Sequence, residues 1–149
     1  MSKAARCFED VTLGEALPEV AFEMTLPALV IYGAATWDFH RLHYDVPFAE
    51  AAGMRAPIMD GQMAGGLLAR QLMQWGGADA FVRRLSYRLR IPVFLGERIL
   101  LRGSVIGLDD ARALALCRMD ILKEDCTEVV REATGAVELP RRAGPGATA

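Results

Sequence analysis

The segment Trp37–Gly61, WDFHRLHYDVPFAEAAGMRAPIMDG, is the stretch around which the fold is expected to be organised. It contains both histidines of the protein and three aspartates: His40, His43, Asp38, Asp45 and Asp60. Carboxylates and imidazoles are rarely buried unless they are paired or hydrogen-bonded. An apolar run with helical spacing, Gly61–Gln74, follows directly. The segment is therefore predicted to deliver polar groups to the start of a helix, and an active site is predicted at this junction.

The first half of the chain is predicted to form one strand and three helices. Alternating apolar and polar side chains indicate the strand, and prolines suit the first turn of two of the helices. Gly65 and Gly66 lie inside the last helix, where a glycine costs about 1 kcal/mol, so close approach of another backbone or of a ligand is expected there. The predicted elements are a strand at Val20–Thr25 and helices at Pro27–Trp37, Pro47–Ala52 and Gly61–Trp75.

Strand patterns fill the second half of the chain. Long strands joined by short polar turns favour an antiparallel meander. One strand, helices and then four strands predict an α+β fold in which an antiparallel sheet covers the apolar helix Gly61–Trp75. The predicted strands are Phe81–Val93, Glu97–Ile106, Ala111–Leu122 and Thr127–Leu139.

Length and composition indicate one domain that associates with another subunit. A chain of 149 residues is long enough to bury a single core, and 52% hydrophobic with 24% charged residues is typical of a globular protein. The expected boundaries are a single domain over residues 1–139 and a flexible tail over 140–149, which is rich in glycine and proline. One helix cannot cover so long a sheet, so pairing of two subunits is expected.

Charge and cysteine content exclude several classes of partner. A net charge of -2 provides no general attraction for nucleic acid or for an anionic membrane. There is no run of roughly 20 apolar residues and no apolar stretch typical of a signal peptide at the start, so a cytoplasmic protein is expected. The three cysteines are scattered without metal-ligand spacing, which predicts reduced thiols and no zinc site: Cys7, Cys117 and Cys126.

Asp38 and His43 have the chemistry needed to activate water. An imidazole can take a proton from a water molecule, while a neighbouring carboxyl group orients that water or returns a proton to the other side of the reacting bond. The backbone N–H groups of Gly61 and Gln62 at the start of the next helix can stabilise an oxyanion that develops on a thioester. From spacing alone, the acid and the imidazole also fit a purely structural hydrogen-bonded pair.

The segment resembles the MaoC-like hydratase/dehydratase family, of the (R)-specific enoyl-CoA hydratase type, in the hot-dog fold superfamily. The family pattern has an aromatic residue, then G-D-x-N-P-x-H-x-D, an alanine, a glycine, and P-I-x-H-G at the start of the central helix. The stretch Phe8–Gly14, FEDVTLG, is also similar to the family's opening. The residues that match the pattern, in order, are Tyr32, Asp38, His43, Asp45, Ala49, Gly53, Pro57, Ile58 and Gly61.

The resemblance implies a hot-dog fold, in which a curved antiparallel sheet wraps around a long central helix, and a dimer of such subunits. It implies reversible addition of water across the 2,3-double bond of an acyl-CoA or acyl-carrier thioester. Asp38 and His43 become the catalytic pair, and Gly61 becomes the oxyanion donor. No metal and no cofactor are expected, because coenzyme A enters as part of the substrate. A homodimer or higher homo-oligomer is expected, with a hetero-oligomer as the alternative.

Four residues depart from the family pattern. Trp37 replaces a glycine beside Asp38 and is expected to shape the acyl pocket. His40 replaces an asparagine that helps to hold the site, and Arg41 replaces a proline. Asp60 replaces the histidine before the helix glycine.

Two alternative functions stay open beside hydration. Asp60 is expected to cap the central helix, as Asp45 is expected to cap the short helix before it. Hot-dog thioesterases often use a carboxylate near this helix to activate water, so Asp60 also supports an acyl-CoA thioesterase. A non-catalytic acyl-CoA-binding partner subunit of a hetero-oligomeric hydratase is the second alternative.

Overall fold

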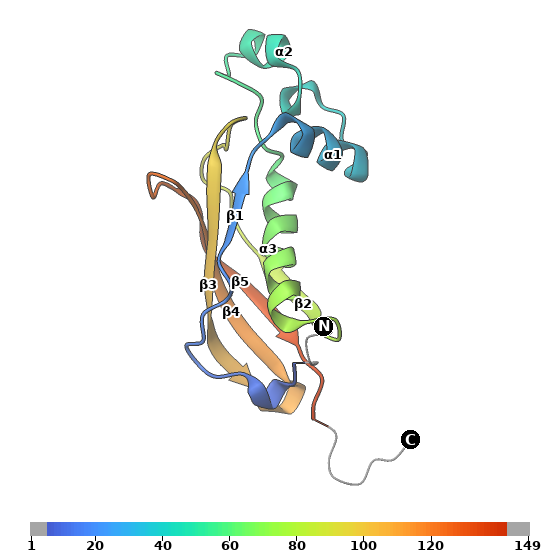
Figure 1. Ribbon diagram of the computed structural model, residues 1–149, viewed down its shortest axis with the longest axis vertical. Helices are drawn as coiled ribbons and strands as arrows, with labels where there is room; N and C mark the ends of the chain where they lie inside the picture. Colours follow the sequence, from blue (N-terminus) through green and yellow to red (C-terminus); the bar gives the residue numbers. More distant parts are fainter. Residues whose placement is uncertain (1–5, 143–149) are drawn as a thin grey trace.

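The computed structural model describes residues 6–142, and within them a curved antiparallel sheet of five strands wraps around one long helix (Figure 1). The spatial order of the strands is β1-β3-β4-β5-β2, and every neighbouring pair is antiparallel. The α+β class and the sheet around a central helix are therefore confirmed. The strands are β1 (Val20–Glu23), β2 (Phe81–Ser86), β3 (Arg98–Asp109), β4 (Leu114–Lys123) and β5 (Glu128–Glu138).

The core lies between the sheet and helix α3 (Gly61–Gly76). Every second residue along much of β4 is buried, including Cys117, Met119 and Ile121, as expected for a strand with one face on a core. Leu68 and Leu72 of α3 are fully buried in the same cluster. This shared apolar face holds the long helix along the concave side of the sheet and fixes where its N-terminus lies.

The other helices lie beyond one end of the sheet, beside the start of α3 (Figure 1). Thr25 caps the N-terminus of helix α1 (Leu26–Thr36), where its hydroxyl accepts the N–H of Ala28. Helix α2 (Val46–Ala51) begins with Asp45, whose carboxylate accepts the N–H of Phe48, as predicted. The predicted segment Trp37–Gly61 thus forms a cap over the end of the sheet. In residues 6–142, no helix is long and apolar enough to cross a membrane.

The predicted strand Phe81–Val93 is wrong in its second half. β2 ends at Ser86, and of the remaining residues only Leu89 forms an isolated bridge, to Val130. The side chain of Tyr87 turns onto α3, where its hydroxyl donates to the carbonyl of Gly61 at 3.2 Å. The simple meander is also wrong for β2, which pairs with β5 and not with β3.

Tyr87 also explains one of the two glycines inside α3. A Cβ atom on Gly65 would lie 2.5 Å from the Tyr87 hydroxyl, so any side chain there would displace the ring. A Cβ atom on Gly66 would meet only Tyr32 Cε2, at an ordinary 3.8 Å. The packing of this chain therefore requires a glycine at position 65, whereas position 66 could accept a methyl group.

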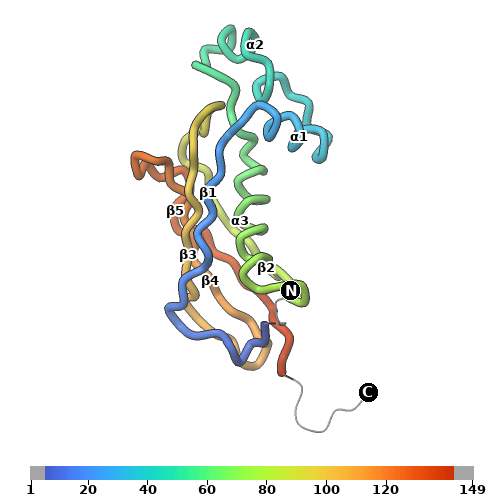
Figure 2. The backbone as a smooth tube through the Cα atoms, in the orientation of Figure 1, coloured from blue at the N-terminus to red at the C-terminus, as the bar shows by residue number. Residues whose placement is uncertain are grey.

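The predicted flexible tail over 140–149 begins with ordered residues. Phe8 donates its N–H to the carbonyl of Pro140 at 2.9 Å, and the N–H of Arg142 donates to Glu9 at 3.0 Å. The start of the described chain and its end consequently lie side by side, at the end of the sheet opposite α1 (Figure 2). Residues 143–149 lie outside the described part of the chain.

Candidate active site

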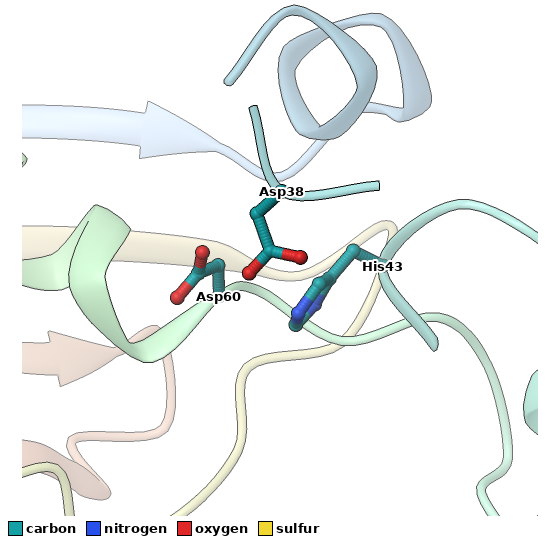
Figure 3. A group of neighbouring side chains, drawn as sticks. All are labelled: Asp38, His43 and Asp60. Atoms are coloured by element: carbon teal, nitrogen blue, oxygen red, sulfur yellow. The ribbon is translucent and has the colours of Figure 1, made fainter. Parts of the chain in front are cut away.

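Three side chains from different segments converge near the start of α3 (Figure 3). Asp38 follows α1, His43 ends a short 3₁₀ turn at Arg41–His43, and Asp60 immediately precedes α3. One oxygen of each carboxylate and one ring nitrogen of His43 all lie within 4.8 Å of one another. The acid and the imidazole that the sequence pairs are therefore together, with a second carboxylate beside them.

The end of α1 holds Asp38 in place. Trp37 terminates the helix in the left-handed conformation, with φ of 62°, and the N–H of Asp38 then donates to the carbonyl of Gly33 at 2.9 Å. The Asp38 carboxylate accepts the N–H of His40 through Oδ1 at 3.0 Å. Glycine usually occupies the left-handed position after a helix, which explains why the family pattern has a glycine where this chain has Trp37.

One hydrogen bond determines which nitrogen of the His43 ring carries the proton in the neutral form. Nδ1 lies 2.8 Å from the carbonyl oxygen of Ile58, and a carbonyl can only accept, so Nδ1 carries the proton. In the neutral ring this leaves Nε2 with a free lone pair. His43 is thus held in the tautomer that a general base requires.

Asp60 has two roles. Its Oδ1 accepts the N–H of Gln62 at 2.7 Å, which confirms the predicted cap of α3. Its side chain is also part of the three-residue cluster, and the residue is only 9% exposed. A second, buried carboxyl group therefore lies beside Asp38.

The two predicted oxyanion donors differ in this structure. The N–H of Gln62 is occupied by Asp60, so the expectation that Gln62 binds an oxyanion does not fit this geometry. Gly61 is the first residue of α3, where a backbone N–H has no acceptor within the helix. Gly61 therefore remains the expected oxyanion donor, and this role stays a prediction.

The three side chains line a small pocket whose other walls are largely apolar. Leu29 and Met63 are buried, and Tyr32 presents its ring from α1. Burial raises the pKa of Tyr32, and the nearby charges of Asp60 and Asp38 raise it further, so its hydroxyl stays protonated. The sequence reasoning matched Tyr32 to the family pattern but did not place it in the pocket. The sequence did contain a signal for this place, because Tyr32 lies only four residues before the end of α1 and therefore close to Asp38 along the chain.

The acid and the imidazole are close enough for one water molecule to bridge them, but the pocket around them is closed in this structure, with a free volume of about 0 Å³. A water that makes two hydrogen bonds of about 2.8 Å can bridge polar atoms up to roughly 5.6 Å apart. The polar atoms of Asp38 and His43 lie within that limit. A water molecule can therefore bind between these two groups only when the pocket opens.

Two predicted site-shaping residues lie outside this pocket. Trp37 is 83% exposed, and its ring packs edge-on against Phe39 rather than toward Asp38. The ring of His40 accepts the N–H of Leu42 through Nδ1, and it lies 6.0 Å from the His43 ring between centroids. The expectation that Trp37 shapes the acyl pocket therefore stays a prediction. His40 acts by holding the Asp38 carboxylate through its backbone.

Asp38, His43 and Asp60 are also residue types that can bind a divalent cation. Ligand atoms on one tetrahedral zinc ion lie roughly 3.3 Å apart, given bonds of about 2.0–2.1 Å. The three ligand atoms lie within 4.8 Å of one another, a limit that includes such separations, so the geometry is compatible with a bound cation. That the protein works without a metal or cofactor stays a prediction.

The comparisons with known proteins bear on the family and on the fold. A sequence model of the MaoC like domain matches residues 12–122. The chain is 26% identical over 98 residues to the 3-oxo-4,17-pregnadiene-20-carboxyl-CoA hydratase beta subunit of Mycobacterium tuberculosis, which covers 66% of this chain and 76% of that protein.

Two solved structures have the same fold. The R-hydratase PhaJ1 from Pseudomonas aeruginosa superimposes with a TM-score of 0.84 at 15% identity, over 96% of this chain and 95% of that one. The ChsH1–ChsH2 complex from Mycobacterium tuberculosis contains a chain with a TM-score of 0.79 at 23% identity, over 87% of this chain and 98% of that one. These structures confirm the hot-dog fold.

Proposed function

Because this chain belongs to the MaoC-like hydratase/dehydratase family, we propose that it reversibly hydrates a 2-enoyl thioester to a 3-hydroxyacyl thioester. The observation that carries the proposal is the state of His43. Its Nδ1 is fixed on the carbonyl of Ile58, which leaves the lone pair of Nε2 free, and a ring nitrogen of His43 lies within 4.8 Å of a carboxylate oxygen of Asp38. This is the arrangement that water activation needs.

The reaction proceeds by addition of one water across the double bond. His43 Nε2 takes a proton from the water that Asp38 orients, and the water oxygen bonds to C3. The electrons of the double bond move to the thioester carbonyl, whose oxygen is stabilised by the N–H of Gly61. The proton that His43 took from the water is returned at C2, which restores the neutral imidazole and completes the 3-hydroxyacyl product, and dehydration follows the same steps in reverse.

Coenzyme A is the proposed carrier, since the relative from Mycobacterium tuberculosis is named as a hydratase of a CoA thioester. The same name describes a beta subunit, which supports a hetero-oligomer beside the homodimer that we favour. Both the carrier and the need for a second subunit are tested by following the loss of enoyl absorbance with the purified chain alone, across a panel of enoyl-CoAs. Full activity alone would exclude a non-catalytic partner subunit, whereas activity only with a second chain would support one.

A thioesterase is the second candidate, because Asp60 lies in the pocket beside the proposed carbonyl site. For a hydratase, we expect Asp60→Asn to keep hydration within about tenfold, since the amide oxygen can still cap α3. We also expect that neither the wild type nor this variant releases the free thiol of coenzyme A. Thiol release followed with a chromogenic disulfide reagent measures this. Release by the wild type that disappears in Asp60→Asn would establish hydrolysis instead.

Removal of divalent cations is expected to leave hydration unchanged. The proposed mechanism assigns proton transfer to His43 and oxyanion stabilisation to Gly61, and neither step uses a metal. Activity should therefore be the same, within error, after dialysis against EDTA and after addition of Zn²⁺-free Mn²⁺ or Mg²⁺. A rate that falls with EDTA and returns with one cation would show that Asp38, His43 and Asp60 act as metal ligands.

A further inference from the structure

The cluster of Asp38, His43 and Asp60 has the size of a three-ligand metal site. One oxygen of each carboxyl group and one ring nitrogen of His43 lie within 4.8 Å of one another (Figure 3). Three atoms that close together leave a central point at most about 2.8 Å from each, and zinc binds nitrogen and oxygen ligands at about 2.0–2.2 Å. A small inward shift of the three side chains would therefore bring all of them within coordination distance of one ion.

Each of the three side chains is held by one hydrogen bond to a backbone group. Those bonds run from the N–H of His40 to Asp38 Oδ1 (3.0 Å), from the N–H of Gln62 to Asp60 Oδ1 (2.7 Å), and from His43 Nδ1 to the Ile58 carbonyl (2.8 Å). A histidine that ligates a metal almost always donates its other ring N–H in this way, and ligating carboxylates are hydrogen-bonded as well. Within residues 6–142, no hydrogen bond occupies His43 Nε2 or the Oδ2 atom of either aspartate, so these atoms are available to a metal.

The surroundings of the cluster favour a cation. Buried carboxylates are paired with a positive group or coordinate a metal. Asp60 is only 9% exposed, and the described residues that line the pocket include neither lysine nor arginine. The free volume of about 0 Å³ leaves no room for a water molecule, but an ion that lies between its three ligand atoms does not need that space. A divalent cation can thus compensate two carboxylates where no basic side chain does.

We propose that Zn²⁺ binds to Asp38, His43 and Asp60 and inhibits the hydratase. One imidazole nitrogen with two carboxylate oxygens is a donor set that suits zinc. The bound ion takes the lone pair of His43 Nε2, which the reaction needs to accept a proton from water. The inhibition rests on the proposed function, whereas the binding does not. Because the ion is an inhibitor and not a cofactor, its removal by EDTA restores the rate.

Asp60→Asn tests the binding, and Asp45→Asn is its matched control. Both aspartates cap a helix, and asparagine can keep either cap, but only Asp60 belongs to the cluster. Titration calorimetry of EDTA-treated, desalted protein with Zn²⁺ should give one ion per chain. Its Kd should rise at least tenfold in Asp60→Asn, which lacks one ligand, and stay within twofold in Asp45→Asn. An unchanged Kd in Asp60→Asn would place the ion elsewhere, for example at the exposed thiol of Cys126, and the inference would be wrong.

The enoyl-CoA assay tests the inhibition. At a free Zn²⁺ concentration about ten times the wild-type Kd, hydration by the wild type should fall about tenfold, and hydration by Asp60→Asn about twofold or less. A wild type saturated with Zn²⁺ that keeps its full rate would overturn the proposed inhibition. If Asp60→Asn weakens zinc binding while no enoyl-CoA is hydrated by the metal-free wild type, the zinc site stands and the proposed function fails. Should Asp60→Asn not fold, the Kd for Zn²⁺ is measured with His43→Gln, which removes the ring nitrogen and should raise it at least tenfold.

Discussion

Replacing Asp38 with Asn or His43 with Gln is expected to lower the rate of enoyl-CoA hydration at least a hundredfold, or about 2.7 kcal/mol of transition-state stabilisation. Both substitutions keep the size of the side chain. His43→Gln removes the free ring nitrogen that accepts a proton, and Asp38→Asn removes the negative charge that orients the water. In Asp38→Asn the amide oxygen can still accept the N–H of His40, so the turn should survive.

The control for this experiment is His40→Gln. His40 lies three residues before His43, and the centroids of the two rings are 6.0 Å apart, but His40 does not line the pocket. We expect His40→Gln to retain hydration within a few-fold, because the backbone N–H of residue 40 still holds Asp38. The change should affect kcat more than KM if the lost interactions act in the transition state. A folded His43→Gln protein with more than a tenth of the wild-type rate would show that another group takes the proton.

The local features of the site could be predicted from the sequence because each depends on near neighbours along the chain. Asp45 and Asp60 cap the helices that directly follow them, and both caps are present. Asp38 and His43 are only five residues apart, so a short turn is enough to bring them together. For the same reason, the bounds of α3 were predicted to within one residue.

The remaining features depend on tertiary contacts that spacing does not encode. β2 pairs with β5 across the sheet, so the strand that follows it in sequence is not its neighbour. Tyr87 continues the strand alternation in sequence, but it leaves the sheet to reach Gly61 and to cover Gly65. In each case a contact made after folding overrides the local pattern.

Gly33 is the residue through which the packing of α1 controls the position of Asp38. It is buried, and an added Cβ atom would lie 2.6 Å from the backbone carbonyl oxygen of Asp38. The N–H of Asp38 also donates to the carbonyl of Gly33 at 2.9 Å. The obstructing atom belongs to the backbone, so it cannot be relieved by a change of rotamer. A side chain at position 33 must therefore move Asp38 itself.

Gly33→Ala is accordingly expected to lower hydration by about a hundredfold, since a displacement of about 1 Å at a catalytic group has an effect of that size. The stability should change less, because overpacking costs about 1–3 kcal/mol and the better helix propensity of alanine returns about 1 kcal/mol. Gly66→Ala is the matched control for stability: its new methyl group meets Tyr32 at 3.8 Å, so this variant should have a higher free energy of unfolding. Urea denaturation and the enoyl-CoA assay measure the two effects separately. A folded Gly33→Ala protein with the wild-type rate would mean that the position of Asp38 does not limit the reaction, and the catalytic role assigned to this carboxylate would then be wrong.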